Sequence, residues 1–323
     1  MELKLLKPED VLVPCDVPQN MVDTYIENFL GMTHNTGKLM LFAGDQRIEH
    51  AKGNKDFCGD GIAPEDNDPE HLFRIAKDGE IGVFAAQPGL ITRYAMDYKE
   101  VPYLVKMNSK TNFVKTEQDD PYSSLLIDID DIVELKNNAG LNIPAVGYTV
   151  YLGSEYEDQM ITESSNIIRG AHKNGMLAVL WIYPRGAAVT KDDEKDPHSI
   201  AGAAGYGASV GADFVKLNYP SDSNPKLFKE VAGAAGRTGV VFAGGSSTDP
   251  KEFLERLYDQ IYVSEAIGNA TGRNLHQKPL DEAIMMCDAI SAITLYGQDV
   301  NTAMEIYEGR LTLDNVKKGI IFT

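Results

Sequence analysis

The segment Gly211-Ala-Asp-Phe-Val-Lys-Leu-Asn-Tyr-Pro220 is a short apolar run with one lysine in its middle. Phe214, Val215 and Leu217 are typical of a buried strand in a parallel sheet, which is apolar on both faces. Lys216 interrupts this run where no solvent-facing side is expected. Two interpretations are open: the strand ends at Val215 and Lys216 points into water beyond it, or Lys216 is buried because it has a chemical role.

The chemical role would be the formation of a Schiff base. A lysine in a dry site, or beside another cation, loses proton affinity and becomes a free amine near neutral pH. Such an amine can attack the carbonyl carbon of a substrate. One lysine near the end of a strand does not decide between the two interpretations, so the rest of the chain has to.

From Lys38 onward, short apolar runs alternate with helical patterns, which predicts a parallel sheet in an α/β fold. Eight strands are predicted, at 39–43, 81–85, 103–107, 145–150, 178–182, 214–217, 240–243 and 263–267. Helices are predicted at 69–77, 127–137, 157–173, 201–210, 226–235, 250–260 and 280–295. Eight such units fit a closed (β/α)8 TIM barrel, and a doubly wound open sheet is the alternative.

Residues 1–36 precede the first predicted strand and contain an amphipathic pattern near Met21–Leu30. We expect them to form an N-terminal extension that packs on the barrel or at a subunit interface. Residues 37–323 would then be the catalytic barrel domain.

The composition restricts the possible partners and the compartment. The chain has 48 acidic and 30 basic residues, a formal charge of −18, which argues against a general binder of nucleic acid or of anionic membranes. Cys15, Cys58 and Cys287 are widely spaced and indicate neither a disulfide framework nor a zinc cluster. The N-terminus has no apolar signal core, and no run approaches the ~20 apolar residues of a membrane span. We therefore expect a cytoplasmic protein.

In a (β/α)8 barrel, the chemistry lies at the carboxyl ends of the strands. Polar, aromatic and glycine residues fall at the predicted ends: Asp45, Lys106, Trp181, Tyr183, Lys216, Gly244 and Gly245. This pattern predicts a single active-site mouth.

The segment Asp45-Gln-Arg-Ile-Glu-His50 follows the first predicted strand. Asp45 can position a lysine or a substrate hydroxyl, and Arg47 can meet a phosphate through paired hydrogen bonds. Asp, Glu and His are also metal ligands, so a metal site is an alternative. Surface charges that cap a helix are a third interpretation, for Glu49 and His50.

Trp181 and Tyr183 are two residues apart in a predicted strand, so both rings lie on one face. If that face is the barrel interior, the Tyr183 hydroxyl can transfer a proton while Trp181 packs against the substrate. The alternative is that both are ordinary core aromatics.

Two glycine-containing turns predict a phosphate site. Gly244, Gly245 and Ser246 follow the seventh predicted strand, and Gly272 and Arg273 follow the eighth. Backbone N–H groups at such turns bind anions, and glycine lets the phosphate approach the backbone. The loops after strands seven and eight are where barrels often bind phosphate.

Together, these motifs resemble, in the same order, those of the archaeal-type class I fructose-bisphosphate aldolases of the DeoC/FbaB aldolase superfamily. The resemblance runs from about Lys38 to Gly297. Family members usually have Asp-His-Gly-Ile-Glu-His after the first strand, whereas this chain has Asp45-Gln-Arg-Ile-Glu-His50, so the charge of the pocket differs there.

The resemblance implies a lyase of glycolysis and gluconeogenesis that reversibly cleaves fructose 1,6-bisphosphate into dihydroxyacetone phosphate and glyceraldehyde 3-phosphate. It implies no metal and no cofactor, only a covalent Schiff base through Lys216. Tyr183 would transfer protons, Asp45 would aid the iminium steps, and Trp181 would shape the pocket. The implied phosphate ligands are Gly244, Gly245, Ser246, Gly272 and Arg273 for the C1 phosphate, and Arg185 or Arg47 for the other phosphate.

Two alternatives remain on sequence grounds. One is a related lysine-dependent, transaldolase-like synthase of the archaeal aromatic-amino-acid route, and the other is a non-catalytic protein that binds sugar phosphates. Phosphorylated ketoses and trioses are the expected small-molecule partners. By family analogy we expect a homo-oligomer, based on a pentamer or forming a decamer.

Overall fold

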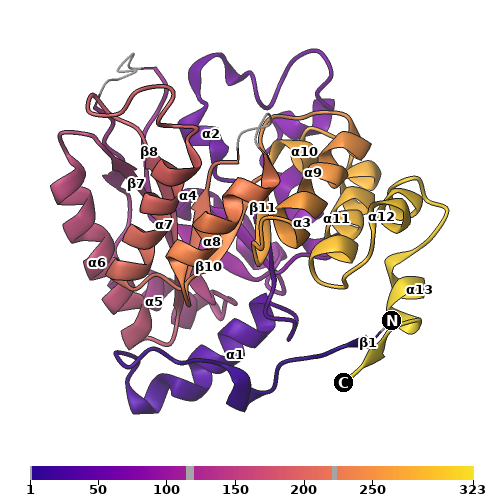
Figure 1. Cartoon of the computed structure of the whole chain (residues 1–323), viewed down its shortest axis with the longest axis horizontal. Helices are drawn as coiled ribbons and strands as arrows, with labels where there is room; N and C mark the ends of the chain where they lie inside the picture. The colour runs from indigo at the N-terminus through magenta and orange to yellow at the C-terminus, as the bar shows by residue number, and fades with distance from the viewer. Residues whose placement is uncertain (1, 114–119, 220–223) are drawn as a thin grey trace.

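The computed structural model describes residues 2–113, 120–219 and 224–323, and its centre is a closed barrel of parallel strands surrounded by helices (Figure 1). The strands follow one another around the barrel in chain order: β2 (Leu39–Ala43), β3 (Val83–Ala86), β4 (Tyr103–Lys106), β7 (Ala145–Leu152), β8 (Leu177–Pro184), β9 (Phe214–Leu217), β10 (Gly239–Ala243) and β11 (Gly268–Thr271). Pairing of β11 with β2 closes the sheet, with Ala270 opposite Leu41. The predicted (β/α)8 barrel is confirmed, and the open sheet is excluded.

Helices surround the barrel; those up to α9 connect successive strands, and α10 to α13 follow the last barrel strand. They are α2 (Gln46–Glu49), α3 (Glu70–Asp78), α4 (Pro88–Tyr94), α5 (Ile129–Ala139), α6 (Glu157–Lys173), α7 (Pro197–Val210), α8 (Lys229–Ala235), α9 (Pro250–Tyr262), α10 (Arg273–His276), α11 (Leu280–Thr294), α12 (Val300–Tyr307) and α13 (Leu313–Lys318). Helix α7 begins earlier than predicted because the Asp196 side chain accepts a hydrogen bond from the Ser199 N–H and Pro197 fits the first turn. None of the helices in the described ranges is long and apolar enough to cross a membrane.

The prediction of the eighth strand at 263–267 is wrong, because α9 continues to Tyr262 and the strand is Gly268–Thr271. Its Gly-Asn-Ala-Thr sequence has no apolar run, yet all four residues are buried. Asn269 Nδ2 donates to Thr294 Oγ1 at 2.8 Å, and Thr271 Oγ1 donates to Asn269 Oδ1 at 2.9 Å. These polar side chains satisfy each other and a threonine of α11 between the strand and the helix layer, so burial does not require apolar residues there.

The N-terminal segment covers the end of the barrel at which the strands begin. Helix α1 (Val22–Met32) lies below the barrel, at the end opposite to α2 (Figure 1). The Phe29 ring stacks on the Phe214 ring with centroids 6.0 Å apart, and Tyr25 and Met32 are buried in the same apolar cluster. A short parallel pair of strands, β1 (Glu2–Leu3) and β12 (Ile321–Phe322), joins the first and last described segments.

One buried carboxylate attaches this segment to the barrel. Asp213, just before β9, accepts hydrogen bonds from the Tyr25 hydroxyl, from the Ala178 N–H at 2.7 Å and from His172 Nε2 at 3.1 Å. His172 Nδ1 lies 2.9 Å from both carboxylate oxygens of Asp16. Burial by itself lowers the pKa of His172, but the two carboxylates outweigh it and raise the pKa to about 9. The His172 imidazolium therefore bridges the N-terminal segment and the barrel floor.

We expect this imidazolium to stabilise the fold at neutral pH but not in alkali. Because the pKa of His172 rises from 6.5 in the unfolded chain to about 9 in the fold, its stabilisation is complete below pH 6.5 and is lost as the pH rises through 9. A shift of this size corresponds to about 3 kcal/mol. Urea unfolding of wild type and His172→Gln between about pH 6 and about pH 10 measures the effect, since the difference in their free energies of unfolding should shrink.

His198→Gln is the matched control. His198 is exposed and pairs with Glu230 at the surface, so its removal should change the free energy of unfolding little at any pH. A His172→Gln effect that stays constant over the whole pH range would contradict the expected role of the imidazolium.

Candidate active site

Lys216 lies inside the barrel, in β9, with 6% of its surface exposed. Its neighbour in the adjacent strand β8 is Trp181, and Lys216 Nζ lies 5.0 Å from the centroid of the Trp181 ring. The strand continues to Leu217, so the interpretation in which it ends at Val215 and Lys216 points into water is wrong. The side chain instead enters the space enclosed by the barrel.

The surroundings of Lys216 favour the free amine. Burial lowers the pKa of Lys216, and the positive charges of Lys106 and Arg273 lower it further, while the carboxylates of Asp45 and Glu49 oppose the shift. The amine therefore needs less alkaline conditions to act as a nucleophile than an exposed lysine does.

A second buried lysine, Lys106 at the end of β4, reaches the same region. Its Nζ donates to the Asn108 backbone oxygen at 2.8 Å and to Asn108 Oδ1 at 3.1 Å, and lies 3.7 Å from Glu49 Oε1. The same Nζ lies 5.5 Å from the centroid of the Trp181 ring. Lys106 is among the residues predicted from the sequence to lie at the mouth, but no role was predicted for it. The available signal was a lysine in an otherwise apolar strand, as at Lys216.

The carboxyl ends of the strands enclose an inner cavity of about 150 Å³ next to Lys216. Its lining consists of Asp45, Gln46, Glu49, His50, Tyr183, Lys216, Asn218, Ala243, Gly244, Gly245, Ala270, Gly272 and Arg273. Seven of the residues that the sequence singled out are thus brought together: Asp45, Tyr183, Lys216, Gly244, Gly245, Gly272 and Arg273. Trp181 does not line this cavity and is fully buried in the barrel interior, in contact with the lysines.

Tyr183 and Asp45 bring a phenol and a carboxylate to this cavity. Burial raises the pKa of the Tyr183 hydroxyl well above its usual value, and Glu49 and Asp45 raise it further, so the phenol is protonated and can donate. Its ring stacks on Tyr151 with centroids 6.0 Å apart. Asp45 is 2% exposed, and no hydrogen-bond donor in the described part of the chain contacts its Oδ1. That oxygen can accept a proton or a hydrogen bond from a ligand.

The turn after β10 lines the cavity with Gly244 and Gly245. The Gly244 oxygen accepts hydrogen bonds from Arg256 at 2.6 Å and from Asn274 at 3.3 Å, and Asn274 also binds the Ser246 oxygen at 3.1 Å. In a trans peptide the next N–H points opposite to the carbonyl, so the Gly245 N–H is directed away from Arg256. The φ angle of Gly245 is +76°, which favours glycine.

Gly272, after β11, completes the turn region. A Cβ atom there would lie 2.4 Å from Gln46 Nε2 and 2.7 Å from the Ala43 oxygen, so only glycine fits. With Gly245 and Arg273, it forms a wall of donors that suits an anion.

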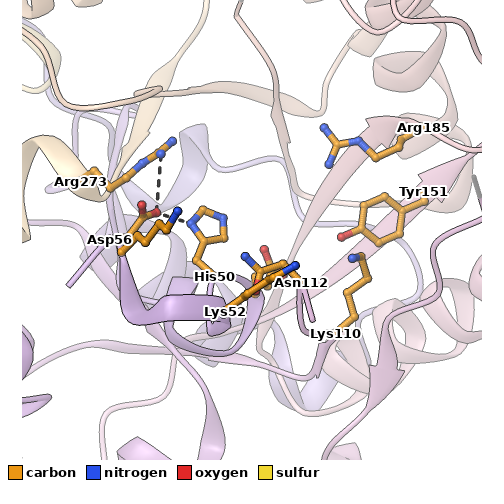
Figure 2. A pocket seen from close by; sticks show the side chains of 10 residues that line it. His50, Lys52, Asp56, Lys110, Asn112, Tyr151, Arg185 and Arg273 are labelled. Atoms are coloured by element: carbon orange, nitrogen blue, oxygen red, sulfur yellow. Dashed lines mark hydrogen bonds and ion pairs between the residues drawn. The ribbon is translucent and has the colours of Figure 1, made fainter. Parts of the chain in front are cut away.

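A second, outer cavity of about 340 Å³ adjoins the inner one and shares Glu49, His50 and Arg273 with it. Its other lining residues are Lys52, Lys55, Asp56, Lys110, Asn112, Tyr151 and Arg185 (Figure 2). Cations outnumber carboxylates here, although the whole chain is acidic. The outer cavity is therefore suited to a second anionic group.

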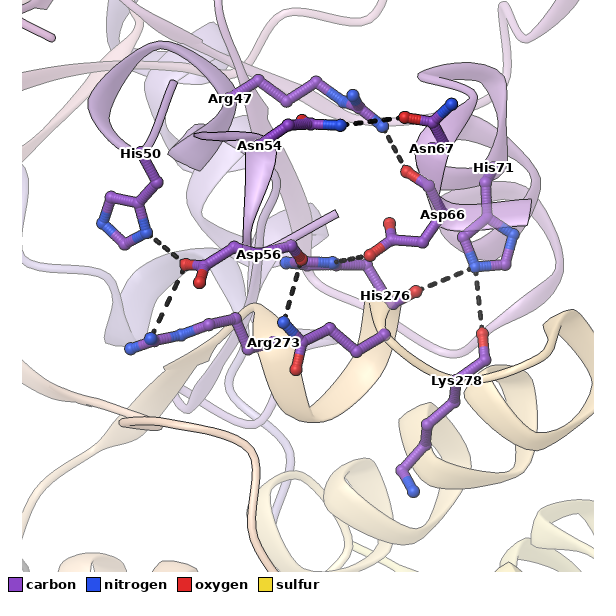
Figure 3. Close-up of polar contacts among 11 residues, drawn as sticks. Arg47, His50, Asn54, Asp56, Asp66, Asn67, His71, Arg273, His276 and Lys278 are labelled. Carbon is purple, nitrogen blue, oxygen red and sulfur yellow. Dashed lines mark hydrogen bonds and ion pairs between the residues drawn. The ribbon is translucent and has the colours of Figure 1, made fainter. Parts of the chain in front are cut away.

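The two arginines considered for that second group lie in different places. Arg185 lines the outer cavity and pairs with Glu194 at 3.4 Å. Arg47 lines neither cavity. It donates to the Asp66 backbone oxygen (Figure 3), and its guanidinium lies 4.1 Å from the centroid of the Phe57 ring.

A polar cluster holds the loop after β2 against the segment after β11 (Figure 3). The Asp56 carboxylate contacts His50 Nδ1 and lies 3.6 Å from an Arg273 nitrogen, so it holds both residues at the boundary between the cavities. His276 Nδ1 lies 2.7 Å from Asp66 Oδ2, and both side chains are fully buried. Within the described ranges, no group of three or more His, Cys, Asp or Glu side chains is arranged to hold a metal ion.

Comparisons with known proteins agree with this geometry. Residues 39–278 match the model of the DeoC/LacD family aldolases. A protein of Methanocaldococcus jannaschii named fructose-bisphosphate aldolase/6-deoxy-5-ketofructose 1-phosphate synthase is 57% identical over 308 residues, which are 95% of this chain and 97% of that protein. The structure of a fructose-bisphosphate aldolase from Slackia heliotrinireducens matches with a TM-score of 0.92 and 52% identity, covering 95% of this chain and 97% of that one.

A further structure is that of an archaeal fructose-1,6-bisphosphate aldolase whose catalytic lysine is covalently bound to the carbinolamine intermediate of its substrate. It matches with a TM-score of 0.71 and 31% identity, and covers 83% of this chain and 98% of that one.

Gly147 in β7 makes room for Trp181, and we expect Gly147→Ala to disturb both stability and the site. A Cβ atom at position 147 would lie 2.6 Å from the Trp181 ring and 2.6 Å from the Leu104 side chain. Overpacking of this kind costs about 1–3 kcal/mol. Urea unfolding measures the loss, and the emission of Trp181, the single tryptophan, should change in the folded variant.

Gly202→Ala, in helix α7, is the control for the same substitution without a clash. No atom lies within 4 Å of a Cβ at position 202, so this change should leave stability unchanged or raise it slightly. Equal stabilities of the two variants would show that the Gly147 site has spare room.

Proposed function

The chain belongs to the DeoC/LacD aldolase family, and we propose that it is a class I fructose-bisphosphate aldolase that acts through a Schiff base on Lys216. It cleaves fructose 1,6-bisphosphate reversibly into dihydroxyacetone phosphate and glyceraldehyde 3-phosphate. The observation that supports this most strongly is a buried lysine in the same cavity as a protonated tyrosine and a glycine-lined anion site.

Binding orients the ketose carbonyl toward Lys216. In our proposal the C1 phosphate accepts hydrogen bonds from the N–H groups of Gly245 and Gly272 and from Arg273, at the wall of the inner cavity formed by Gly244, Gly245 and Gly272, with Ser246 next to it. The cavity extends from this wall to Lys216, which sets the C2 carbonyl beside the amine.

Imine formation then uses Tyr183 as the acid. The Lys216 amine adds to C2 and gives a carbinolamine, and the Tyr183 phenol protonates the departing hydroxyl group, which leaves as water. This step creates the iminium and a phenolate. Asp45, whose Oδ1 is free of protein donors in the described ranges, accepts hydrogen bonds from the nitrogen and the hydroxyl during these changes.

Cleavage returns the proton to Tyr183. The phenolate removes the proton of the C4 hydroxyl, the C3–C4 bond breaks, and its electron pair moves into the iminium to form an enamine. The aldehyde product leaves and Tyr183 protonates C3 of the enamine, which restores the iminium. Water then adds to C2 and gives its proton to the Tyr183 phenolate, and collapse of the carbinolamine releases dihydroxyacetone phosphate and the free lysine. Trp181 shapes the floor beneath Lys216 throughout.

The second phosphate belongs in the outer cavity. We propose Arg185 as its principal ligand, helped by Lys52, because both line that cavity. Arg47 is the weaker candidate because its guanidinium is engaged with Asp66 and Phe57.

The name of the Methanocaldococcus jannaschii relative supports a second activity for this chain, that of a 6-deoxy-5-ketofructose 1-phosphate synthase. By its name this sugar has a C1 phosphate but no C6 phosphate. The inner cavity would therefore serve both sugars, whereas the cations of the outer cavity would matter only for the bisphosphate.

We further propose that the protein acts in the cytoplasm as a homo-oligomer, with residues 1–36 as an extension and 37–323 as the catalytic domain. Every residue of the inner cavity falls between Asp45 and Arg273, which supports this division. Leu12 and Ile321 are each 66% exposed and provide apolar surface on the extension and near its pairing partner.

Replacement of Lys216 tests the Schiff base. Wild type treated with dihydroxyacetone phosphate and borohydride should gain a stable adduct in its intact mass, and Lys216→Met should gain none. Cleavage activity of Lys216→Met should fall by ~10³-fold or more, since the covalent route is lost. An active wild type that forms no adduct would sink the proposal.

Replacement of Arg185 tests the second phosphate site. Arg185→Ala should raise KM for fructose 1,6-bisphosphate by roughly 10–100-fold, the equivalent of one charge-assisted hydrogen bond. Cleavage of 6-deoxy-5-ketofructose 1-phosphate should change by less than about threefold, because that sugar has nothing to bind there.

Two further arginine variants serve as comparisons. Arg93→Ala removes an exposed guanidinium from α4. It should change neither the KM for fructose 1,6-bisphosphate nor the KM for 6-deoxy-5-ketofructose 1-phosphate. If Arg47→Ala raises KM for the bisphosphate and Arg185→Ala does not, the second phosphate lies elsewhere.

A further inference from the structure

Two buried lysines from different strands approach the same tryptophan ring. Lys216 Nζ lies 5.0 Å from the centroid of the Trp181 ring, and Lys106 Nζ lies 5.5 Å from it. Lys106 has no exposed surface, whereas Lys216 lines the inner cavity. Since like charges in a dry site repel, such an arrangement requires a compensating group.

Lys106 is held rigidly. Its two hydrogen bonds go to Asn108, which is itself fixed: Asn108 Nδ2 donates to the Thr149 oxygen at 2.9 Å and to the Ser123 oxygen at 3.2 Å, and Asn108 Oδ1 accepts from the Thr149 N–H at 2.7 Å. All four residues are buried. The ammonium position is therefore set by the framework of β4 and β7.

Glu49 is the compensating group. Its Oε1 lies 3.7 Å from Lys106 Nζ, beyond hydrogen-bond length, and no donor in the described part of the chain satisfies that buried oxygen. Glu49 lines both the inner and the outer cavity. Its carboxylate thus lies between a fixed cation and the space that the substrate would fill.

We propose that Lys106 and Glu49 form a positioning pair for Lys216. Lys106 holds a fixed positive charge at the Trp181 ring and keeps the Glu49 carboxylate at the junction of the two cavities, and together they set the charge on Lys216. The inference rests on the proposed Schiff-base function and adds two residues to it.

The groups around Lys216 come from several elements: Asp45, Glu49 and His50 from the segment after β2, Lys106 from β4, Tyr183 from β8 and Arg273 from α10. Of the two cations that favour the neutral amine, Arg273 is the one that would bind the C1 phosphate. Bound phosphate would offset its charge. Lys106 faces the protein and keeps its effect while the substrate is bound, which is when the amine must be neutral.

The pH dependence of imine formation tests the pair. The rate of adduct formation from dihydroxyacetone phosphate and cyanoborohydride should fall as the pH is lowered and Lys216 gains a proton. We call this falling part of the curve of rate against pH the acid limb. In Lys106→Met this acid limb should move to higher pH, because a cation that disfavours protonation of Lys216 is gone. In Glu49→Gln it should move to lower pH, because a carboxylate that favours protonation is gone. We expect each limb to move by about half a pH unit or more, which is roughly a threefold change in rate on the acid side.

Conservative and remote variants complete the experiment. Lys106→Arg keeps the charge and should restore the wild-type limb. Lys136→Met removes a lysine that donates to the Ile143 oxygen outside both cavities, and it should not move the limb. If the substitutions only damaged the structure, the rate of adduct formation would fall in every variant. The acid limbs of Lys106→Met and Glu49→Gln would then not move in opposite directions.

The outcomes separate the two levels of the proposal. If wild type forms no adduct, the Schiff-base function itself fails. If wild type forms the adduct and the limbs of folded Lys106→Met and Glu49→Gln coincide with the wild-type limb, or move in the same direction, the positioning pair is overturned while the function stands. If Lys106→Met does not fold, Glu49→Gln and Lys106→Arg still decide between these results.

Discussion

The exclusion of water from one amine is the constraint on which the structure depends. An ammonium group in an apolar interior is unfavourable, so burial of Lys216 shifts it toward the neutral, nucleophilic form. The closed sheet achieves this burial because Trp181, opposite Lys216 in the next strand, fills the barrel beneath the lysine. Gly147 in turn provides the space for the indole ring. The reactivity of Lys216 at the mouth thus depends on how Trp181 and Gly147 pack inside the barrel.

Different segments of the chain contribute the donors and the acceptors of the inner cavity. The segments after β10 and β11 contribute donors, the glycine N–H groups and Arg273, while the segment after β2 contributes the carboxylates of Asp45 and Glu49. A sugar phosphate has the matching polarity, with an acidic group at one end and hydroxyl groups along its chain. An acidic protein can therefore bind an anion, because a few local cations and backbone dipoles decide the potential at the site rather than the net charge.

Much of the architecture could be predicted from the sequence, because seven of the eight barrel strands are apolar runs whose positions the pattern reveals. The eighth could not, because Asn269 and Thr271 satisfy each other and a distant threonine, which no local pattern encodes. Helices α4, α12 and α13 were also missed. The first two lack a long amphipathic repeat, and α13 has only six residues.

The site was predictable where a residue type at a strand end is unusual, as with Lys216, or where glycines follow a strand, as at Gly244 and Gly245. The partners of Arg47 were not predictable, because its contacts with Asp66 and Phe57 depend on how a long loop folds back. Lys106 and Glu49 were visible as residues, but their proximity is a property of three-dimensional packing between β4 and α2.

The helix below the barrel covers the lower end, so the active site is reached from the upper end. Apolar side chains of the strands fill the barrel interior, and Tyr25, Phe29 and Met32 of the N-terminal segment pack against them from below, so the described residues leave no passage from one end of the barrel to the other. Sugar, aldehyde and the water molecule released at each imine formation must all use the upper opening. Molecules must therefore enter and leave one after another. A substrate or product bound in that opening also keeps water away from Lys216 until it leaves.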